Sequence, residues 1–307
     1  MDTVIQLMGP TAAGKSRISI QVAREFNCEI ISADSMQVYR GFDLGTDKVP
    51  PDQRDGIPHH LIDILENCEQ FNAHRFLIRS HRIAREIIGR GRLPLVSGGT
   101  ALYFRVMDRG IFPEKKDRGQ ARREIEEGVR MRGLDYYWRE LIRIDPEYAQ
   151  TIGPRDRIRI VRALEIHRNT GLPPTRMFRQ NQTPFADFRL IRIALKVNRD
   201  ILYQRIEQRV EDMIRRGLVE EVRQLAEKYP RSCPPFRAIG YREILDLLDG
   251  KISLPAAVDL LKRNSRRYAK RQLTWFRNQP NLQWFSPDDI AGIFSALRAA
   301  LGSGSAF

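Results

Sequence analysis

The sequence predicts an α/β fold, in which a parallel β-sheet flanked by helices carries an inserted all-helical domain. Two observations lead to this prediction. Short apolar runs of strand type alternate with helical stretches, an order typical of a parallel, doubly wound sheet. Between residues 113 and 187, by contrast, the chain contains charged helical stretches and no run of strand type. We therefore assign residues 1–112 and 188–307 to the sheet core and residues 113–187 to the helical insertion.

The first part of the core alternates between the two kinds of element. Apolar runs that are short enough for strands are separated by stretches in which apolar residues recur at helical spacing. The predicted strands are residues 4–8, 29–34, 59–65 and 93–97, and the predicted helices are residues 17–26 and 71–90.

The insertion and the second part of the core are mainly helical. A single further apolar run, at residues 188–197, is expected to return the chain to the sheet. The predicted helices of the insertion are residues 115–132, 134–144 and 154–169, and those of the core are residues 199–229, 241–249 and 254–277. A short final strand is predicted at residues 282–285.

The turn after the first strand has the pattern of a phosphate-binding loop. Residues 9–16 match G-x-x-x-x-G-K-[ST] and lie between a strand and a helix, a context that aims backbone N–H groups and the positive helix end at an anion. Lys15 can reach the far phosphate, and Ser16 is placed to ligate Mg²⁺. The core is therefore predicted to be P-loop NTPase-like. The expected phosphate-binding residues are Gly9, Pro10, Thr11, Ala12, Ala13, Gly14, Lys15 and Ser16.

Two further polar residues lie at the carboxyl ends of predicted strands. Asp34 ends the second strand, and Thr100 follows two glycines after the strand at residues 93–97. Functional residues collect at this edge of open parallel sheets, so we expect both in the same crevice as the phosphate loop. Asp34 could equally serve as a helix N-cap, and the sequence does not decide between the two roles.

The chain is strongly basic. It has 52 Lys and Arg residues against 38 Asp and Glu residues, a formal net charge of +14. Basic residues are dense at residues 155–162, and they recur every four residues between 262 and 271 with no acidic residue from 262 to 277. Because surface helices usually alternate in sign, these clusters favour a nucleic-acid partner over a merely solvated face.

Other features exclude several classes of protein. No apolar run approaches the length of a membrane span, so we expect no membrane partner. The three cysteines, Cys28, Cys68 and Cys233, show neither a disulfide framework nor a metal-binding spacing. We therefore expect a monomeric protein in the reducing cytoplasm.

These observations alone leave the reaction open. A phosphate loop suits a small-molecule kinase, an NTP-driven RNA-binding protein or a transferase with another phosphorylated donor. A small-molecule kinase would not need the basic clusters. An NTP-driven protein would be expected to show a strand-end Asp for Mg²⁺ and an arginine finger, for which Asp63 is a weak candidate.

The ordered set of motifs resembles the bacterial tRNA dimethylallyltransferase family. Besides the phosphate loop, the similar stretches are residues 34–39 (DSMQVY), 59–63 (HHLID), 98–103 (GGTALY), 162–165 (RALE), 217–223 (GLVEEVR), 239–243 (IGYRE) and 268–276 (YAKRQLTWF). The resemblance implies transfer of a dimethylallyl group from dimethylallyl diphosphate to N6 of the adenosine 3′ to the tRNA anticodon, with Mg²⁺ as cofactor. It also implies that the target base is flipped out of its stack.

The resemblance also implies roles for individual residues. Asp34 corresponds to the base that takes the N6 proton, Thr100 to a residue at the bridging oxygen, and Lys15 and Arg223 to stabilisers of the leaving diphosphate. The insertion would grip the anticodon stem-loop. The implied tRNA contacts are Asp34, Ser35, Met36, Gln37, Thr100, Arg122, Ile158, Arg159, Ile160, Val161 and Arg162.

The sequence departs from the family at one of these contacts. Where the family commonly has Asp-Pro-Gln-Arg, this chain has Asp156-Arg157-Ile158-Arg159. An isoleucine cannot form the hydrogen bonds of a glutamine, which puts base reading at Ile158 in question.

Overall fold

The computed structural model describes residues 1–66, 68–111, 119–180 and 182–302, and it divides the chain into two units. Met1–Arg105 and Pro184–Phe307 form what we call the core unit, and Val106–Thr183 form the helical unit. The division therefore falls inside helix α3 (Ala101–Arg109), earlier than the expected start at residue 113, which lies outside the described residues. The change in composition along the sequence follows α3, whereas the division into units falls within it.

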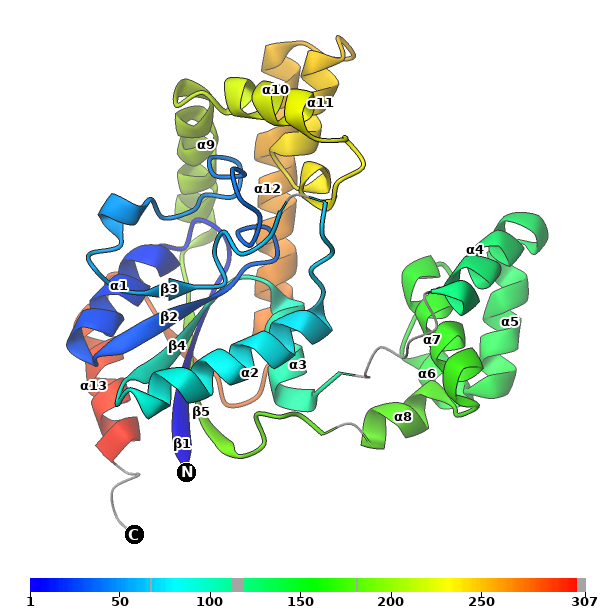
Figure 1. The fold of residues 1–307 in the computed structure, drawn as a ribbon, viewed down its shortest axis with the longest axis horizontal. Helices are drawn as coiled ribbons and strands as arrows, with labels where there is room; N and C mark the ends of the chain where they lie inside the picture. Colours follow the sequence, from blue (N-terminus) through cyan, green and yellow to red (C-terminus); the bar gives the residue numbers. More distant parts are fainter. Residues whose placement is uncertain (67, 112–118, 181, 303–307) are drawn as a thin grey trace. The chain divides into compact units, whose positions relative to one another are not determined.

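The core unit is built on a parallel sheet with the strand order β3-β2-β4-β1-β5-β6 (Figure 1). All of its pairings are parallel, which confirms the predicted sheet. The strands are β1 (Asp2–Met8), β2 (Cys28–Ala33), β3 (His59–His60), β4 (Leu93–Gly98), β5 (Phe188–Leu195) and β6 (Gln283–Phe285).

Strand β3 is much shorter than the predicted strand at residues 59–65. The chain leaves the extended conformation at Leu61, whose φ is 61°, and again at Asp63, whose φ is 55°. These left-handed residues cannot continue a strand. The segment instead turns toward the residues that follow β2, where Tyr39 and Leu65 form an isolated bridge.

Helices cover both faces of the sheet. Helices α1 (Lys15–Glu25) and α13 (Ile290–Gly302) pack on one face, against Ile5, Leu7 and Leu95 among others. Alternate residues such as Val4 and Val96 are equally buried, because successive strand side chains point to opposite faces. Helices α2 (Ala73–Gly89) and α3 lie along that second face, and α2 contacts β4 and β2 (Figure 1).

A second apolar cluster lies beyond the carboxyl ends of the strands. It is formed by four helices together with Val38, Tyr39 and Phe42, which follow β2. The chain after β2 therefore has its own apolar support, although it forms no long helix or strand there. The four helices are α9 (Arg199–Arg215), α10 (Leu218–Lys228), α11 (Tyr241–Leu248) and α12 (Leu254–Arg277). The core unit also contains the short 3-10 helices η1 (Pro51–Gln53) and η2 (Pro234–Arg237).

The described part of the helical unit has a separate core. Ile125, Leu141 and Leu164 are buried there, on three different helices. Apolar residues at helical spacing face one another in this core, as the sequence predicts for the insertion. The helices are α4 (Gln120–Arg132), α5 (Leu134–Ile144), α6 (Pro146–Gln150), α7 (Arg157–Thr170) and α8 (Pro174–Gln180).

The cysteines differ from the expectation. Cys68 and Cys233 form a disulfide bond across a sequence separation of 165 residues, and Cys28 is free and buried. Burial raises the pKa of the Cys28 thiol to about 12, so it is poorly reactive. Widely spaced cysteines show no recognisable framework in sequence, and only the fold brings this pair together. In the described part of the chain, no helix is long and apolar enough to cross a membrane.

Candidate functional site

The phosphate loop lies at the carboxyl end of β1 and borders a cavity of about 340 Å³. Gly14 caps the start of α1 with φ 86°, and Ala12 also has a positive φ of 61°. These left-handed residues fold the loop tightly over the helix start, whose first amides have no acceptor within the helix. Five of the eight loop residues line this polar cavity, and Gly9, Pro10 and Ala13 are buried around it. The lining residues of the loop are Thr11, Ala12, Gly14, Lys15 and Ser16.

The Lys15 ammonium is the main positive charge of the loop. Its Nζ donates a hydrogen bond to the carbonyl of Pro10, at 2.8 Å. Burial lowers the pKa of Lys15 to about 8; Arg209 adds to this effect, and Asp34 and Asp47 oppose it. Desolvation makes the ammonium charge of Lys15 energetically costly, and an anion bound in the cavity would offset that cost.

Asp34 follows β2 and lines the same cavity. Its Oδ1 accepts hydrogen bonds from the backbone amides of Met36, at 2.8 Å, and Gln37, at 3.4 Å. Asp34 therefore supports the local turn and faces the cavity. The alternative role as a helix N-cap does not apply, because no helix begins in the described residues directly after Asp34. Burial raises the pKa of this carboxyl, although the two amides and Lys15 oppose the increase. A raised pKa suits a carboxylate that accepts a proton.

Thr100 lies beside Asp34 but lines neither of the cavities described here. Its hydroxyl accepts a hydrogen bond from the amide of Ser35, at 3.3 Å, and its own amide donates to the carbonyl of Ala33, at 3.2 Å. The preceding residues Gly98 and Gly99 do border the polar cavity. Thr100 therefore joins the ends of β2 and β4 next to the cavity wall.

Four side chains reach the polar cavity from α9 and α12, and none of them was predicted as a site residue. Arg205 and Arg209 project from α9, and Tyr268 and Gln272 project from α12. Each pair is spaced four residues apart, so it lies on one face of its helix. That spacing was the available signal, but only the fold shows that these two helix faces meet the loop.

Gln272 connects α12 to both glycine-containing turns of the site. Its Oε1 accepts a hydrogen bond from the amide of Thr11, at 2.9 Å, and its Nε2 donates to the carbonyl of Gly99, at 2.8 Å. A Cβ on Gly99 would lie 2.2 Å from this Nε2, so a larger residue does not fit there. The buried amide therefore sets the spacing between the phosphate loop and the end of β4.

The structure does not bring Arg223 to this cavity, contrary to expectation. Arg223 is an exposed residue of α10 and forms an ion pair with Glu220 in the preceding turn. The arginines that line the cavity are Arg205 and Arg209, one helix earlier. The motif at residues 217–223 is near these arginines in the sequence, but Arg223 itself does not line the cavity.

A second cavity of about 290 Å³ shares Thr11, Asp34, Thr46, Arg209 and Tyr268 with the polar cavity. Much of its remaining lining is apolar. Asp34 thus lies where a polar and a more apolar compartment meet. The apolar residues of this second cavity are Met36, Met213, Ala238, Ile239 and Leu261.

Two of the expected tRNA contacts in the helical unit are not accessible. Ile160 and Val161 are 0% and 1% exposed and belong to the core of that unit. They face inward because a run of consecutive helical residues cannot all lie on one face. Ile158, by contrast, is 74% exposed.

The charged members of the expected set are available at the surface of the helical unit. Arg122 pairs with Glu126 at 3.0 Å, and Arg162 pairs with Glu165 at 3.0 Å. Arg159 pairs with Asp156, the N-cap of α7, at 3.5 Å. Solvent-exposed pairs contribute little energy, so Arg122 and Arg159 could exchange their partners for phosphates. The partner of Arg162 is the buried Glu165, which keeps this arginine in a structural ion pair.

Comparison with known proteins identifies the family. Residues 37–279 match the family described as IPP transferase, and residues 2–55 match the family described as isopentenyl transferase. The chain belongs to the IPP transferase family. The tRNA dimethylallyltransferases of Halalkalibacterium halodurans and Carboxydothermus hydrogenoformans are 42% and 43% identical to it, covering 94% and 92% of this chain and 92% of each relative.

Solved structures of IPP transferases share the fold. The full-length tRNA isopentenylpyrophosphate transferase from Bacillus halodurans has a TM-score of 0.73 at 40% identity, covering 99% of this chain and 98% of that one. A eukaryotic dimethylallyltransferase acting on tRNA has a TM-score of 0.80 at 30% identity, covering 98% of this chain and 79% of that one. The P-loop-like parallel sheet with its helical insertion is thus the architecture of the family.

Proposed function

We propose that this protein transfers a dimethylallyl group from dimethylallyl diphosphate to N6 of the adenosine 3′ to the tRNA anticodon, releasing diphosphate. The observation that carries the proposal is the polar cavity, in which a phosphate loop, two arginines and a buried carboxylate converge. The tRNA dimethylallyltransferases named above support it at over 40% identity. A small-molecule kinase is not favoured, because it would leave the basic clusters unexplained.

The phosphate loop and α9 would hold the diphosphate of the donor. Lys15, Arg205 and Arg209 supply positive charge around the cavity, and the amides at the start of α1 supply further donors. These groups would stabilise the charge that develops on diphosphate as the C–O bond breaks. Arg205 and Arg209 take the role that the sequence suggested for Arg223.

Ser16 fits a place beside a divalent cation. Its side chain is exposed at the cavity, which is also bordered by the carboxylates of Asp34 and Asp47. Mg²⁺ prefers oxygen ligands and commonly uses few protein groups together with substrate phosphates. We therefore retain Mg²⁺ as the cofactor, held by Ser16 and diphosphate oxygens; when bound, it would neutralise charge on the leaving group.

Asp34 would act on the acceptor base. Its Oδ1 is occupied by the turn, and within the described residues Oδ2 has no hydrogen-bond partner, so Oδ2 can accept the N6–H. The new bond joins N6 to the dimethylallyl carbon, the bond from that carbon to diphosphate oxygen breaks, and the N6 proton passes to Asp34. Thr100 would assist by orienting the turn that holds Asp34, through the amide of Ser35.

The target base must leave its stack to reach a carboxylate in a cavity, and a loop nucleotide is easily extruded. We expect the exposed residues Ile158, Arg159 and Arg122, together with the half-exposed Arg162, to contact the anticodon stem-loop. Ser35, Met36 and Gln37 would lie near the base, since they border the two cavities. We retain a monomeric cytoplasmic enzyme as the simplest setting for this reaction.

The decisive experiment combines the protein with dimethylallyl diphosphate, Mg²⁺ and an unmodified tRNA. Nuclease digestion followed by mass spectrometry should find one adenosine, 3′ to the anticodon, that carries the added mass of a dimethylallyl group. A reaction without protein and a reaction with ATP in place of the prenyl donor are the controls. Phosphate transfer from ATP without prenylation would support the kinase alternative instead.

A further inference from the structure

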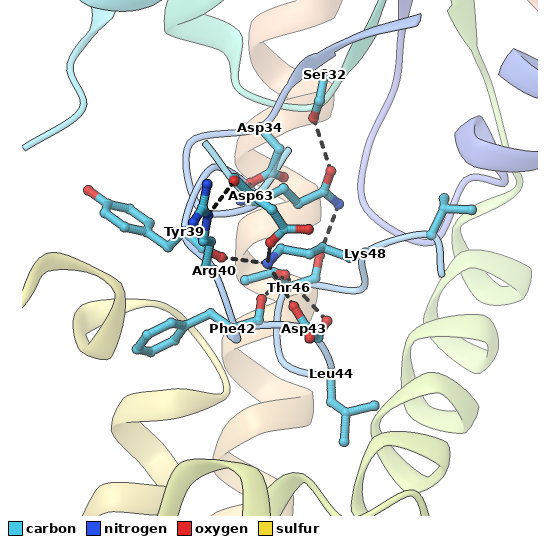
Figure 2. Close-up of polar contacts among 12 residues, drawn as sticks. Ser32, Asp34, Tyr39, Arg40, Phe42, Asp43, Leu44, Thr46, Lys48 and Asp63 are labelled. Carbon is cyan, nitrogen blue, oxygen red and sulfur yellow. Dashed lines mark hydrogen bonds and ion pairs between the residues drawn. The ribbon is translucent and has the colours of Figure 1, made fainter. Parts of the chain in front are cut away.

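Lys48 is a buried lysine outside the phosphate loop, and it binds three oxygens at once. Its side chain is only 4% exposed. The ammonium donates to the Tyr39 carbonyl at 2.5 Å, to Asp43 Oδ1 at 2.7 Å and to Asp63 Oδ1 at 2.6 Å, as Figure 2 shows. A lysine ammonium has three donors, so all of them are used.

These contacts close the segment between residues 39 and 48 and fasten it to the residues after β3. Lys48 bonds to Tyr39 and Asp43 at earlier points of the same segment, and to Asp63 beyond β3. Within the segment, backbone hydrogen bonds between residues close in sequence join Lys48 to Asp43 and Asp47 to Leu44. The segment forms no helix and no long strand. The conformation of the segment therefore depends on side chains, above all on Lys48.

The same segment forms part of the wall of the functional site. Thr46 and Asp47 line the polar cavity, and Gly45 and Thr46 line the second cavity. The side-chain Nε2 of Gln37 donates to the carbonyls of Thr46, at 3.1 Å, and Asp47, at 3.3 Å. The Glu221 carboxylate accepts a hydrogen bond from the backbone amide of Leu44, at 2.8 Å. The wall is thus attached to α10 on one side and to the end of β2 on the other.

Asp47 connects this wall to Arg209, one of the residues proposed to bind diphosphate in the polar cavity. Its Oδ2 lies 3.1 Å from Nη1 of Arg209, whose side chain is 22% exposed. This pair orients the guanidinium at the cavity that both residues line. If the wall moves, Asp47 moves with it, and Arg209 loses the partner that fixes its direction.

Loss of the Lys48 ammonium would be disruptive for an electrostatic reason. Two carboxylates and a carbonyl converge on one point, and without the cation they repel one another and lack donors. The cost falls mainly on the buried Tyr39 carbonyl, which is left without a donor. The side chains of Asp43 and Asp63 are 58% and 40% exposed, so water solvates them in part and their mutual repulsion is moderated. We therefore expect the segment to open locally when the charge is absent.

We propose that Lys48 is a positioning residue for the diphosphate end of the reaction, acting through the wall segment and Asp47 on Arg209. It touches neither substrate. This inference rests on the proposed function of the polar cavity. Its specific consequence is that Lys48 controls diphosphate binding more than tRNA binding, since tRNA affinity depends mainly on phosphate contacts at the protein surface.

The test compares Lys48→Met with a control at a surface lysine, Lys251→Met; the Lys251 side chain is 61% exposed. Lys251 also bridges two carboxylates, Asp246 and Asp249, each at 3.0 Å, but none of the three lines either cavity. Pyrophosphate binding with Mg²⁺ is measured by calorimetry, and KM values for donor and tRNA by steady-state kinetics. We expect Lys48→Met to weaken pyrophosphate binding and raise the donor KM by about tenfold or more, since small misplacements at such sites are costly. The tRNA KM and the Lys251→Met protein should stay within about twofold of wild type.

Two further variants keep the result interpretable. Asp47→Asn removes the charge that faces Arg209. The double variant Lys48→Met/Asp47→Asn should bind pyrophosphate no more weakly than the single variant with the lower affinity, because both substitutions act through the Asp47–Arg209 contact. If Lys48→Met does not fold, Asp63→Asn should give a smaller effect of the same kind.

Each contrary outcome has a defined meaning. Wild-type pyrophosphate affinity in folded Lys48→Met, additive effects in the double variant, or equal increases of both KM values would overturn the role of Lys48. A wild-type protein that binds pyrophosphate but does not prenylate tRNA would overturn the proposed reaction and leave the positioning role standing on the binding data. A wild-type protein that binds no pyrophosphate would overturn both.

Discussion

Asp34 uses its two carboxylate oxygens for different purposes. Oδ1 holds the turn after β2 through the amides of Met36 and Gln37. Oδ2 remains for a substrate donor, beside the positive charges of Lys15 and Arg209 that moderate the pKa increase caused by burial. A structural contact and a chemical task can therefore share one side chain, and substitution by Asn separates them.

Asp34→Asn should lower kcat by about a hundredfold or more, because Asn keeps an acceptor for the turn but cannot take up a proton. Pyrophosphate affinity should stay near that of wild type, since the diphosphate is held by other residues. The check is single-turnover prenylation of tRNA alongside calorimetric binding. Full activity of folded Asp34→Asn would mean that Asp34 serves only the turn.

Lys15 permits a prediction about pH as well as activity. Its pKa is about 8 in the folded protein against an ordinary value of 10.5, so the folded state binds fewer protons between these pH values. The contribution of Lys15 to stability therefore rises as the pH increases from 8 to 10.5. At pH 7 the buried charge is a cost to the ligand-free protein.

Lys15→Met should consequently abolish donor turnover yet raise the Tm of the ligand-free protein at pH 7. This Tm advantage should shrink at pH 10, where wild-type Lys15 is largely neutral in the folded state. Thermal denaturation of both proteins at the two pH values measures the difference, and the remaining titrating groups are common to both. A Tm advantage that is independent of pH would contradict the assigned cause.

At the scale of elements, α12 shows that a stripe of like charge in sequence need not be a stripe of free charge. Lys262 pairs with Glu211 at 2.7 Å, and Arg266 pairs with Glu207 at 2.6 Å, both acidic partners lying on α9. Arg267 and Lys270 are exposed, and no described residue forms an ion pair with either. Only part of the stripe is thus available for RNA phosphates.

The salt dependence of tRNA binding should distinguish these two groups. Arg267→Ala should reduce the slope of log K against log salt by about one, as expected for a lost phosphate contact, whereas Lys262→Ala should leave the slope nearly unchanged. Fluorescence anisotropy with labelled tRNA over a salt series measures both slopes. Equal slopes for the two variants would show that cross-helix pairing does not decide which residues bind RNA.

At the scale of the whole molecule, the two units have separate apolar cores. Every residue that lines the two cavities belongs to the core unit. Ile158, Arg159 and Arg162, by contrast, belong to the helical unit, as does Arg122. The proposed site of prenyl transfer and many of the proposed tRNA contacts therefore belong to different units of the chain.

Replacing Val106–Thr183 with a flexible linker should leave pyrophosphate affinity within about twofold of wild type, because the lining of the cavity is retained. tRNA affinity should fall by at least about tenfold, since several phosphate contacts are removed with the unit. Calorimetry and anisotropy provide the two measurements. Unchanged tRNA affinity in a folded deletion variant would remove the helical unit from RNA recognition.

The sequence by itself determined the features that are local in the chain. The phosphate loop was predictable because eight consecutive residues and their flanking elements contain all of its chemistry. Asp34 was predictable because the end of a parallel strand has a known place in a sheet. The helical insertion was predicted at residues 113–187 from a long stretch without strand patterns, and the helical unit spans Val106–Thr183.

Tertiary structure decided the features that join distant segments. Arg209 and Gln272 reach the phosphate loop from helices some 190 to 260 residues further along the chain. Glu211 neutralises Lys262 from another helix, and Cys68 meets Cys233 across 165 residues. Ile160 lies in an apolar core rather than at an RNA surface. Side-chain partners depend on packing in space, and periodicity along one segment contains no information about which other segment it will face.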